Sequence, residues 1–273
     1  MTQSTLVSLS VVLLASGSAN AWFRVACTGP LVQGFPKLYF RDPKTHLFEP
    51  VGNGGLLIYY QNRGDGDVSQ GGSGLKAFPP GFKMTSGNPA ARSKKYLEGE
   101  GSQAELRERA AQWSCLRYGT TNPGYDGHGF PTTDCEAGFN AHLHLPACWD
   151  GKVTWDIHAF ASRWTFADGW PFVYSNGDPT GCSWHGSLQN GWDTTALQNA
   201  IDKCNNLNDQ TGTGITEACS FLTVAPAATQ NKCKIAPEVK EATDGQLVKL
   251  PGCNPIQAGP GDATLYTDAN CPS

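Results

Sequence analysis

Residues Trp170 to Trp192 read W-P-F-V-Y-S-N-G-D-P-T-G-C-S-W-H-G-S-L-Q-N-G-W. The apolar run from Phe172 to Tyr174 is typical of a buried strand, and the Gly, Asp, Pro and Thr that follow are typical of a loop. Loops held by a rigid strand often carry binding or catalytic groups. The stretch is therefore either a structural turn with a hydrogen-bonded histidine or a functional loop that presents Asp178 and His185.

Asp178 and His185 are the candidate catalytic residues, because a carboxylate and an imidazole can divide acid and base roles between them. Tyr174, Asn176 and Trp184, on the same stretch, are the candidate substrate-binding residues. A glycosidase of the paired-carboxylate type needs a second, well-placed acid, and spacing alone does not select one. A serine hydrolase is disfavoured, because no G-x-S-x-G motif occurs.

The N-terminus has the features of a secretory signal peptide. Leu6 to Ala15 form a short apolar run, and the A-x-A site at Ala19 to Ala21 predicts cleavage before Trp22. The run is too short to span a bilayer, and no later stretch is long and apolar enough to do so. We therefore expect residues 1–21 to be removed and the mature protein to be secreted and extracellular, with no membrane span.

Ten cysteines all fall in the mature part of the chain. An even number in an exported chain predicts a disulfide framework, here of up to five bridges whose connectivity does not follow from sequence. No C-x-x-C pair occurs, which argues against a zinc knuckle or a thioredoxin-like site. The cysteines are Cys27, Cys115, Cys135, Cys148, Cys182, Cys204, Cys219, Cys233, Cys253 and Cys271.

The formal net charge is -4 at pH 7 and the pI is near 5.8. The chain therefore offers no basic field for nucleic acid or an anionic membrane. Eight Trp and eight Tyr supply rings that can stack on neutral sugars, although most such rings fill a core. Together with export, this composition favours a cell-wall polysaccharide as the partner. We expect no cofactor, and we expect a monomer.

Strand patterns dominate, so the predicted fold class is mainly β, with a β-sandwich or jelly-roll-like core, two peripheral helices and several disulfides. The first helix is expected at 102–116, where Ser102 and Glu105 have capping-box spacing. The second is expected from Asp193, its N-cap, to about residue 205. Strands are expected at 22–27, 37–42, 55–62, 75–78, 139–145, 153–158, 172–174 and 219–224.

The strand at 139–145 carries an H-x-H pair, His142 and His144, which is the candidate metal site. Two such side chains lie on one face about 7 Å apart. They can chelate zinc, copper or manganese when a neighbouring strand adds a third ligand. Pairing with 153–158 through a three-residue loop would set His142 opposite His158. An exposed polar strand face explains the same pattern without a metal, and we prefer that interpretation.

Several blocks of the chain resemble the fungal secreted family DUF1996, a family of unknown function. They include A-C-W-D-G-K at 147–152, W-P-F-V-Y-S-N-G-D-P-T-G at 170–181, W-H-G at 184–186 and L-P-G-C-N-P at 250–255. K-A-F-P-P-G-F-K-M-T-S-G-N-P at 76–89 is similar to a further block. The resemblance covers most of residues 22–255 and implies an extracellular fungal protein of unassigned biochemistry.

Two His-rich blocks of that family have no counterpart in this chain. The family carries S-H-x-H soon after its first cysteine and an H-K-S-H-V-A-Y-P-like block after C-W-D-G. Here Cys27 leads almost directly to K-L-Y-F, and Lys152 leads almost directly to V-T-W-D. The resemblance therefore implies a stripped or mis-spliced member, in which His185 alone remains of the family's histidine motifs. Such a member is inactive if the family's site is built from the missing blocks.

We divide the chain into a signal peptide at 1–21, a DUF1996-like domain at 22–233 and an irregular, disulfide-tethered tail at 234–273. The leading hypothesis is a protein that binds or acts on cell-wall polysaccharide, and if it is active it is a carbohydrate-active hydrolase. One alternative is a non-enzymatic structural or effector protein stabilised by disulfides. The other is a metal-binding protein that uses His142 and His144.

Overall fold

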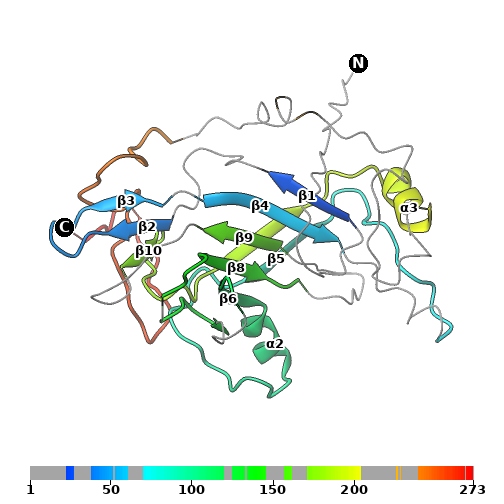
Figure 1. Ribbon diagram of the computed structural model, residues 1–273, viewed down its shortest axis with the longest axis horizontal. Coiled ribbons are helices and arrows are strands. Elements are labelled where there is room, and N and C mark those ends of the chain that lie inside the picture. The colour runs from blue at the N-terminus through cyan, green and yellow to red at the C-terminus, as the bar shows by residue number, and fades with distance from the viewer. Residues whose placement is uncertain are drawn as a thin grey trace.

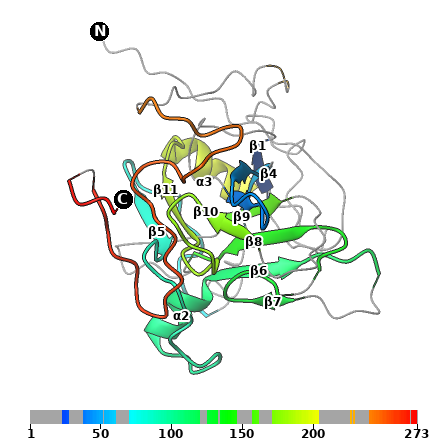
Figure 2. The ribbon, with the colours of Figure 1, turned by 90° about the vertical axis from the view of Figure 1, so that its left-hand side faces the viewer.

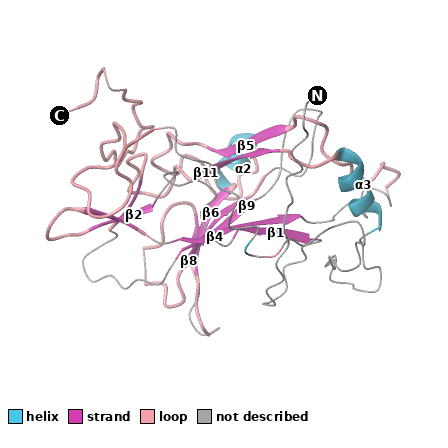
Figure 3. Cartoon of the chain, turned by 90° about the horizontal axis from the view of Figure 1, so that it is seen from above, coloured by secondary structure: helices cyan, strands magenta, loops and turns pink. Residues whose placement is uncertain are grey.

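The computed structural model describes a mainly β chain with two helices among the described residues. The strands gather in the middle of the ribbon, and α3 lies at the end of the molecule away from β2 and β3 (Figure 1). Loops make up much of the remaining chain (Figure 3). The described residues are 23–27, 38–51, 53–60, 70–119, 125–132, 134–145, 157–161, 171–203, 226, 228, 239–267 and 269–272.

The largest sheet has six antiparallel strands in the order β1-β4-β9-β8-β6-β7. It forms where the sequence alternates: in β6, burial alternates residue by residue and Trp113 pairs with Ala141 of β8. The strands are β1 (Phe23–Cys27), β4 (Asn53–Tyr60), β6 (Ala111–Cys115), β7 (Asp126–Gly127), β8 (Phe139–Leu143) and β9 (Ile157–Ala161).

Two smaller antiparallel sheets accompany the large one. In the first, β10 pairs with β2 and sets Phe172 opposite Phe40. In the second, β11 pairs with β5 and sets His185 opposite Gly87. The first sheet contains β2 (Leu38–Arg41), β3 (Phe48–Pro50) and β10 (Phe172–Tyr174), and the second contains β5 (Lys83–Gly87) and β11 (His185–Gln189).

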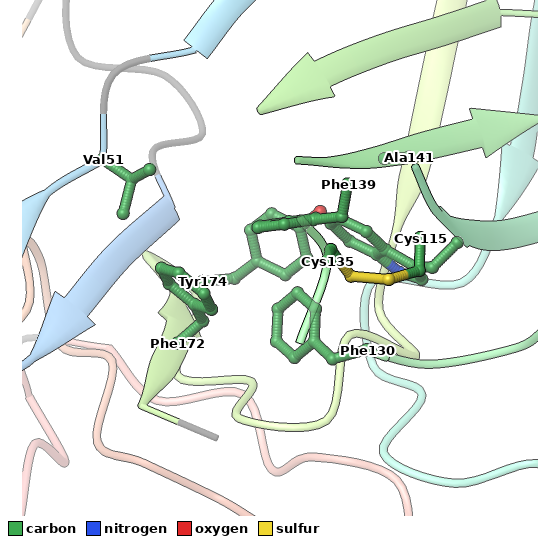
Figure 4. Close-up of a cluster of buried hydrophobic side chains, with 9 residues drawn as sticks. Val51, Cys115, Phe130, Cys135, Phe139, Ala141, Phe172 and Tyr174 are labelled. Carbon is green, nitrogen blue, oxygen red and sulfur yellow. A yellow bond between two sulfur atoms is a disulfide. The ribbon is translucent and has the colours of Figure 1, made fainter. Parts of the chain in front are cut away.

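The main core lies between the large sheet and β10 and is aromatic (Figure 4). Trp113 is 2% exposed, and its ring centroid is 4.7 Å from that of Phe130 and 5.4 Å from that of Phe139. Its indole Nε1 donates to the carbonyl of Gly181 at 3.0 Å. Because that carbonyl belongs to the loop after β10, the core directly holds the loop singled out from the sequence.

The first helix is shorter than predicted. Ser102 is its N-cap and accepts from the amide of Glu105, as the capping spacing indicates, but α2 spans only Gln103–Arg109. The chain then continues as β6, because burial of Ala111, Trp113 and Cys115 in the sheet outweighs continuation of the helix. The prediction of helix to residue 116 was wrong beyond Arg109.

The second helix agrees with the sequence. α3 spans Thr194–Lys203, and the carboxylate of Asp193 accepts from the amide of Ala196 at 2.8 Å. Leu197 and Ala200 form its buried face, with Trp192 packed against them. The mainly β fold with two helices is thus confirmed, while the sandwich or jelly-roll arrangement stays a prediction.

One predicted strand is displaced. No strand forms at 75–78, and β5 begins after Pro79 and Pro80 instead, where β11 offers a partner. Of the strand expected at 153–158, only residues 157 and 158 are described, and they belong to β9, Ile157–Ala161, which sets His142 opposite His158. The predicted signal peptide and the predicted strand at 219–224 lie outside the described residues.

Two disulfides are present among the described cysteines, Cys115–Cys135 and Cys253–Cys271, and Cys182 is a buried free thiol. The second bridge closes the C-terminal tail on itself. The remaining cysteines lie where no side chains are described. No helix in the described parts of the chain is both long and apolar enough to cross a membrane.

Candidate functional site

The loop between β10 and β11 is organised by the carboxylate of Asp178, which is 0% exposed. One carboxylate oxygen, Oδ1, accepts from the amide and the hydroxyl of Thr180 at 2.7 and 2.6 Å. The other, Oδ2, accepts from the amide of Ser183 at 2.8 Å. A buried charge needs such partners, so the T-G-C-S segment folds around this side chain.

Arg92 lies beside Asp178, with its Nε 4.0 Å from Oδ1. The guanidinium also donates to the carbonyl oxygens of Pro89, Ala91 and Asn176. Burial is the main influence on its pKa, which is lowered, while the charge of Asp178 acts in the opposite direction. The same loop raises the pKa of the Tyr174 phenol well above its usual value, through burial first and Asp178 second.

Asn176, Ser183 and His185 form a second layer of hydrogen bonds. The Asn176 amide donates to the hydroxyl of Ser183 at 3.0 Å. The Nδ1 atom of His185 lies 2.8 Å from the carbonyl oxygen of Ser183. Because a carbonyl oxygen can only accept, Nδ1 carries the proton, and in the neutral ring Nε2 is left as an acceptor.

The C-terminal tail closes over this loop. The amide of Gln257 donates to the carbonyl of Gly177 at 2.9 Å. Gly177 has φ +78°, and a Cβ atom there would lie 2.1 Å from the carbonyl oxygen of Pro255. Earlier in the tail, Leu247 bridges to Phe48 of β3. Figure 2 shows this tail, in orange to red, along one side of the ribbon.

Loop and tail together form the walls of an open-sided cavity of about 310 Å³. Its wall is partly aromatic and partly polar. The Tyr174 and Trp184 rings are stacked, with centroids 6.0 Å apart and planes 12° apart. The cavity is lined by Pro89, Tyr174, Ser175, Asn176, Ser183, Trp184, His185, Glu241, Pro251 and Asn254.

Four of the five predicted loop residues line this cavity: Tyr174, Asn176, Trp184 and His185. Asp178 does not, because its carboxylate points into the protein toward Thr180, Ser183 and Arg92. The structure therefore does not bring the predicted catalytic pair together at the cavity.

The tail supplies cavity residues that sequence reasoning missed, Glu241, Pro251 and Asn254. Pro251 and Asn254 lie in the block L-P-G-C-N-P at 250–255, and the family resemblance of that block could have pointed to them. Glu241 stands in a stretch without periodicity, and no sequence pattern pointed to it.

The H-x-H pair lies on β8 and just after it. The ring centroids of His142 and His144 are 6.4 Å apart. His142 also pairs across the sheet with Gln112 of β6. Among the described side chains, no three His, Cys, Asp or Glu residues are grouped to hold a metal ion, and the side chain of His158 is not among those described. The metal site stays a prediction.

The free thiol of Cys182 is buried in this loop and does not line the cavity. Burial raises its pKa, and the charge of Asp178 adds to that rise, whereas its bond with Thr180 opposes it. A thiol that stays protonated and buried is a poor nucleophile. Cys182 therefore serves packing in this loop.

Fold and site together define a mainly β, disulfide-bonded protein with an aromatic and amide-lined cavity between a buried-Asp loop and a C-terminal tail. Residues 34–154 match the family model described as Domain of unknown function (DUF1996), which confirms the resemblance over that segment. The chain matches no curated protein and no solved structure. Most of the cavity residues follow the matched segment, and the absence of the two His-rich blocks stays a prediction.

Proposed function

We propose that the protein is secreted and binds cell-wall polysaccharide in the cavity between the loop and the tail. The observation that supports this is the lining, in which the half-buried Trp184 ring, stacked on the buried Tyr174 ring, lies with the amide of Asn254. Rings cover the apolar faces of sugars, and positioned amides bond their hydroxyls. A volume of about 310 Å³ is within the range of small-ligand sites.

Binding is favoured over hydrolysis by the distribution of carboxylates. Paired-carboxylate catalysis requires two acids facing the scissile bond. Of the described residues that line the cavity, Glu241 alone carries a carboxylate. If the protein is a hydrolase after all, His185 would have Glu241 as its partner in the cavity, and Asp178 would hold the loop.

A structural or effector role is the second candidate. The observation that favours it is the environment of Asp178, whose hydrogen bonds all stabilise the loop. A loop built mainly to fix the fold would show the same network. The two candidates differ in whether the cavity takes a ligand.

The test is affinity electrophoresis and calorimetry with glucans, chitin, cellulose and pectin, together with an assay for released sugars. We expect retardation of the wild type and its loss in Trp184→Ala. Because Trp184 also packs against Trp113, with ring centroids 6.2 Å apart, thermal melts must show that this variant is folded.

Asn254→Ala, which leaves both rings in place, gives an independent measure of the same site. Tyr118→Ala is the matched control, since Tyr118 is 77% exposed and does not line the cavity. Retardation by none of the polymers, with no sugar released, would refute the proposal. Equal losses in Tyr118→Ala and Trp184→Ala would also refute it.

A further inference from the structure

We infer that the cavity selects sugars that carry a protonated amine over neutral or anionic sugars. This rests on the proposed function and names the substrate class for the same site. This selectivity depends on where positive and negative charges lie around Tyr174, Trp184 and Glu241.

Glu241 brings a fixed negative charge to the cavity wall. Its Oε2 accepts from the backbone amide of Gly252 at 2.6 Å, which holds the carboxylate in place on the tail. The bond uses one carboxylate oxygen, so the other can accept from a ligand. An ammonium group is the sugar substituent that best satisfies a carboxylate, since it donates charged hydrogen bonds.

The described residues that line the cavity include no Lys or Arg, so none of them carries a permanent positive charge. Arg92 approaches the same loop, but it is 3% exposed and lies beside the carboxylate of Asp178. A uronic acid would therefore find no fixed cation and would face Glu241, because like charges at short range repel.

The remaining lining groups also suit an amine. The face of an aromatic ring attracts a cation within about 6 Å, and the half-buried Trp184 ring contributes to the wall. His185 holds its Nδ1 proton against the Ser183 carbonyl, so the neutral ring offers Nε2 as an acceptor for an N–H donor. Carboxylate, rings and imidazole thus present acceptors to the same ligand.

The experiment compares oligosaccharides of equal length by calorimetry at low ionic strength. The key pair is a glucosamine oligomer and its N-acetylated counterpart, which share the ring skeleton and differ in charge. A glucose oligomer and a galacturonate oligomer complete the set. We expect the glucosamine oligomer to bind about fivefold more tightly than the N-acetylated one, with a preference that shrinks as salt is added.

The decisive variant is Glu241→Gln, whose side-chain oxygen can still accept from Gly252. It should abolish the preference while retaining binding of the N-acetylated oligomer. Glu100→Gln is the control, because Glu100 is exposed, does not line the cavity and changes the net charge equally. The amine selectivity is refuted if the neutral or anionic oligomers bind more tightly, or if the preference persists in Glu241→Gln. Either result leaves the proposed polysaccharide binding standing. If no oligosaccharide binds, the proposed function falls together with the amine selectivity.

Discussion

The Nε atom of Arg92 lies 4.0 Å from Oδ1 of Asp178, and the two side chains are 1% and 0% exposed. The guanidinium spans from this carboxylate to the carbonyl of Asn176, on the loop that lines the cavity. The buried pair thus connects the segment after β5 to the loop after β10. Its role is to hold one wall of the cavity in place.

Asp178→Ala should destabilise the protein by about 3–5 kcal/mol, because it leaves the buried charge of Arg92 without its partner. Denaturant unfolding followed by Trp fluorescence measures this. Asp262→Asn is the control: it breaks the Lys95–Asp262 ion pair, whose side chains are 43% and 44% exposed, and should leave stability unchanged within error. Similar losses in both variants would contradict the structural role assigned to Asp178.

Gly177→Ala should be more destabilising than Gly245→Ala. The two glycines have nearly the same positive φ, +78° and +80°, so both variants incur the cost of left-handed backbone. Only at Gly177 would the new methyl meet an atom, the carbonyl oxygen of Pro255. We expect an additional loss of about 1–3 kcal/mol at Gly177, measured by urea unfolding, together with weaker ligand binding. Equal losses of stability in the two variants would show that Pro255 of the tail does not pack closely against Gly177.

Cys253→Ser combined with Cys271→Ser should loosen the tail. The bridge spans 18 residues, and its loss is expected to cost about 2–4 kcal/mol in the region that it closes. Hydrogen exchange should accelerate at Gln257 and Ala263, whose amides donate to the loop and to Ala90. Exchange in β6 should be unaffected. Unchanged exchange in the tail would mean that contacts with Gly177 and Ala90 hold it without the disulfide.

Stability should fall at alkaline pH through Tyr39. Burial, with the charges of Asp244 and Glu241, raises its pKa from 10.0 to about 12. The folded state thus favours the neutral phenol. This preference contributes at most roughly 2–3 kcal/mol to the free energy of unfolding, and the contribution is present below pH 10 and lost as the pH rises toward 12.

Tyr39→Phe should remove this alkaline step. It should also cost about 1 kcal/mol at neutral pH, because the hydroxyl donates to the carbonyl of Thr243 at 2.9 Å. Denaturant unfolding across the pH range measures both effects. An alkaline transition that survives in Tyr39→Phe would assign the titration to another group.

Local patterns predicted much of the secondary structure. β10 and α3 were predicted because an apolar run before a turn and an Asp N-cap before a helix are encoded in neighbouring residues. The helix after Ser102 was predicted too long, since nothing local reveals that Trp113 is needed in the core. The register of His142 with His158 was predicted correctly because apolar and polar residues alternate in both segments, and this alternation selects one pairing.

By itself, the sequence determined a mainly β chain, a Gly- and Asp-rich loop after β10, and the aromatic and amide residues that it presents. Only the tertiary structure decided which of them reach the cavity. Asp178 turned inward because Arg92 is buried beside it, and His185 faced the cavity as β11 began. The tail supplied Glu241 and Asn254 from far along the chain. Burial and cavity walls depend on contacts between distant segments, and short-range patterns do not encode those contacts.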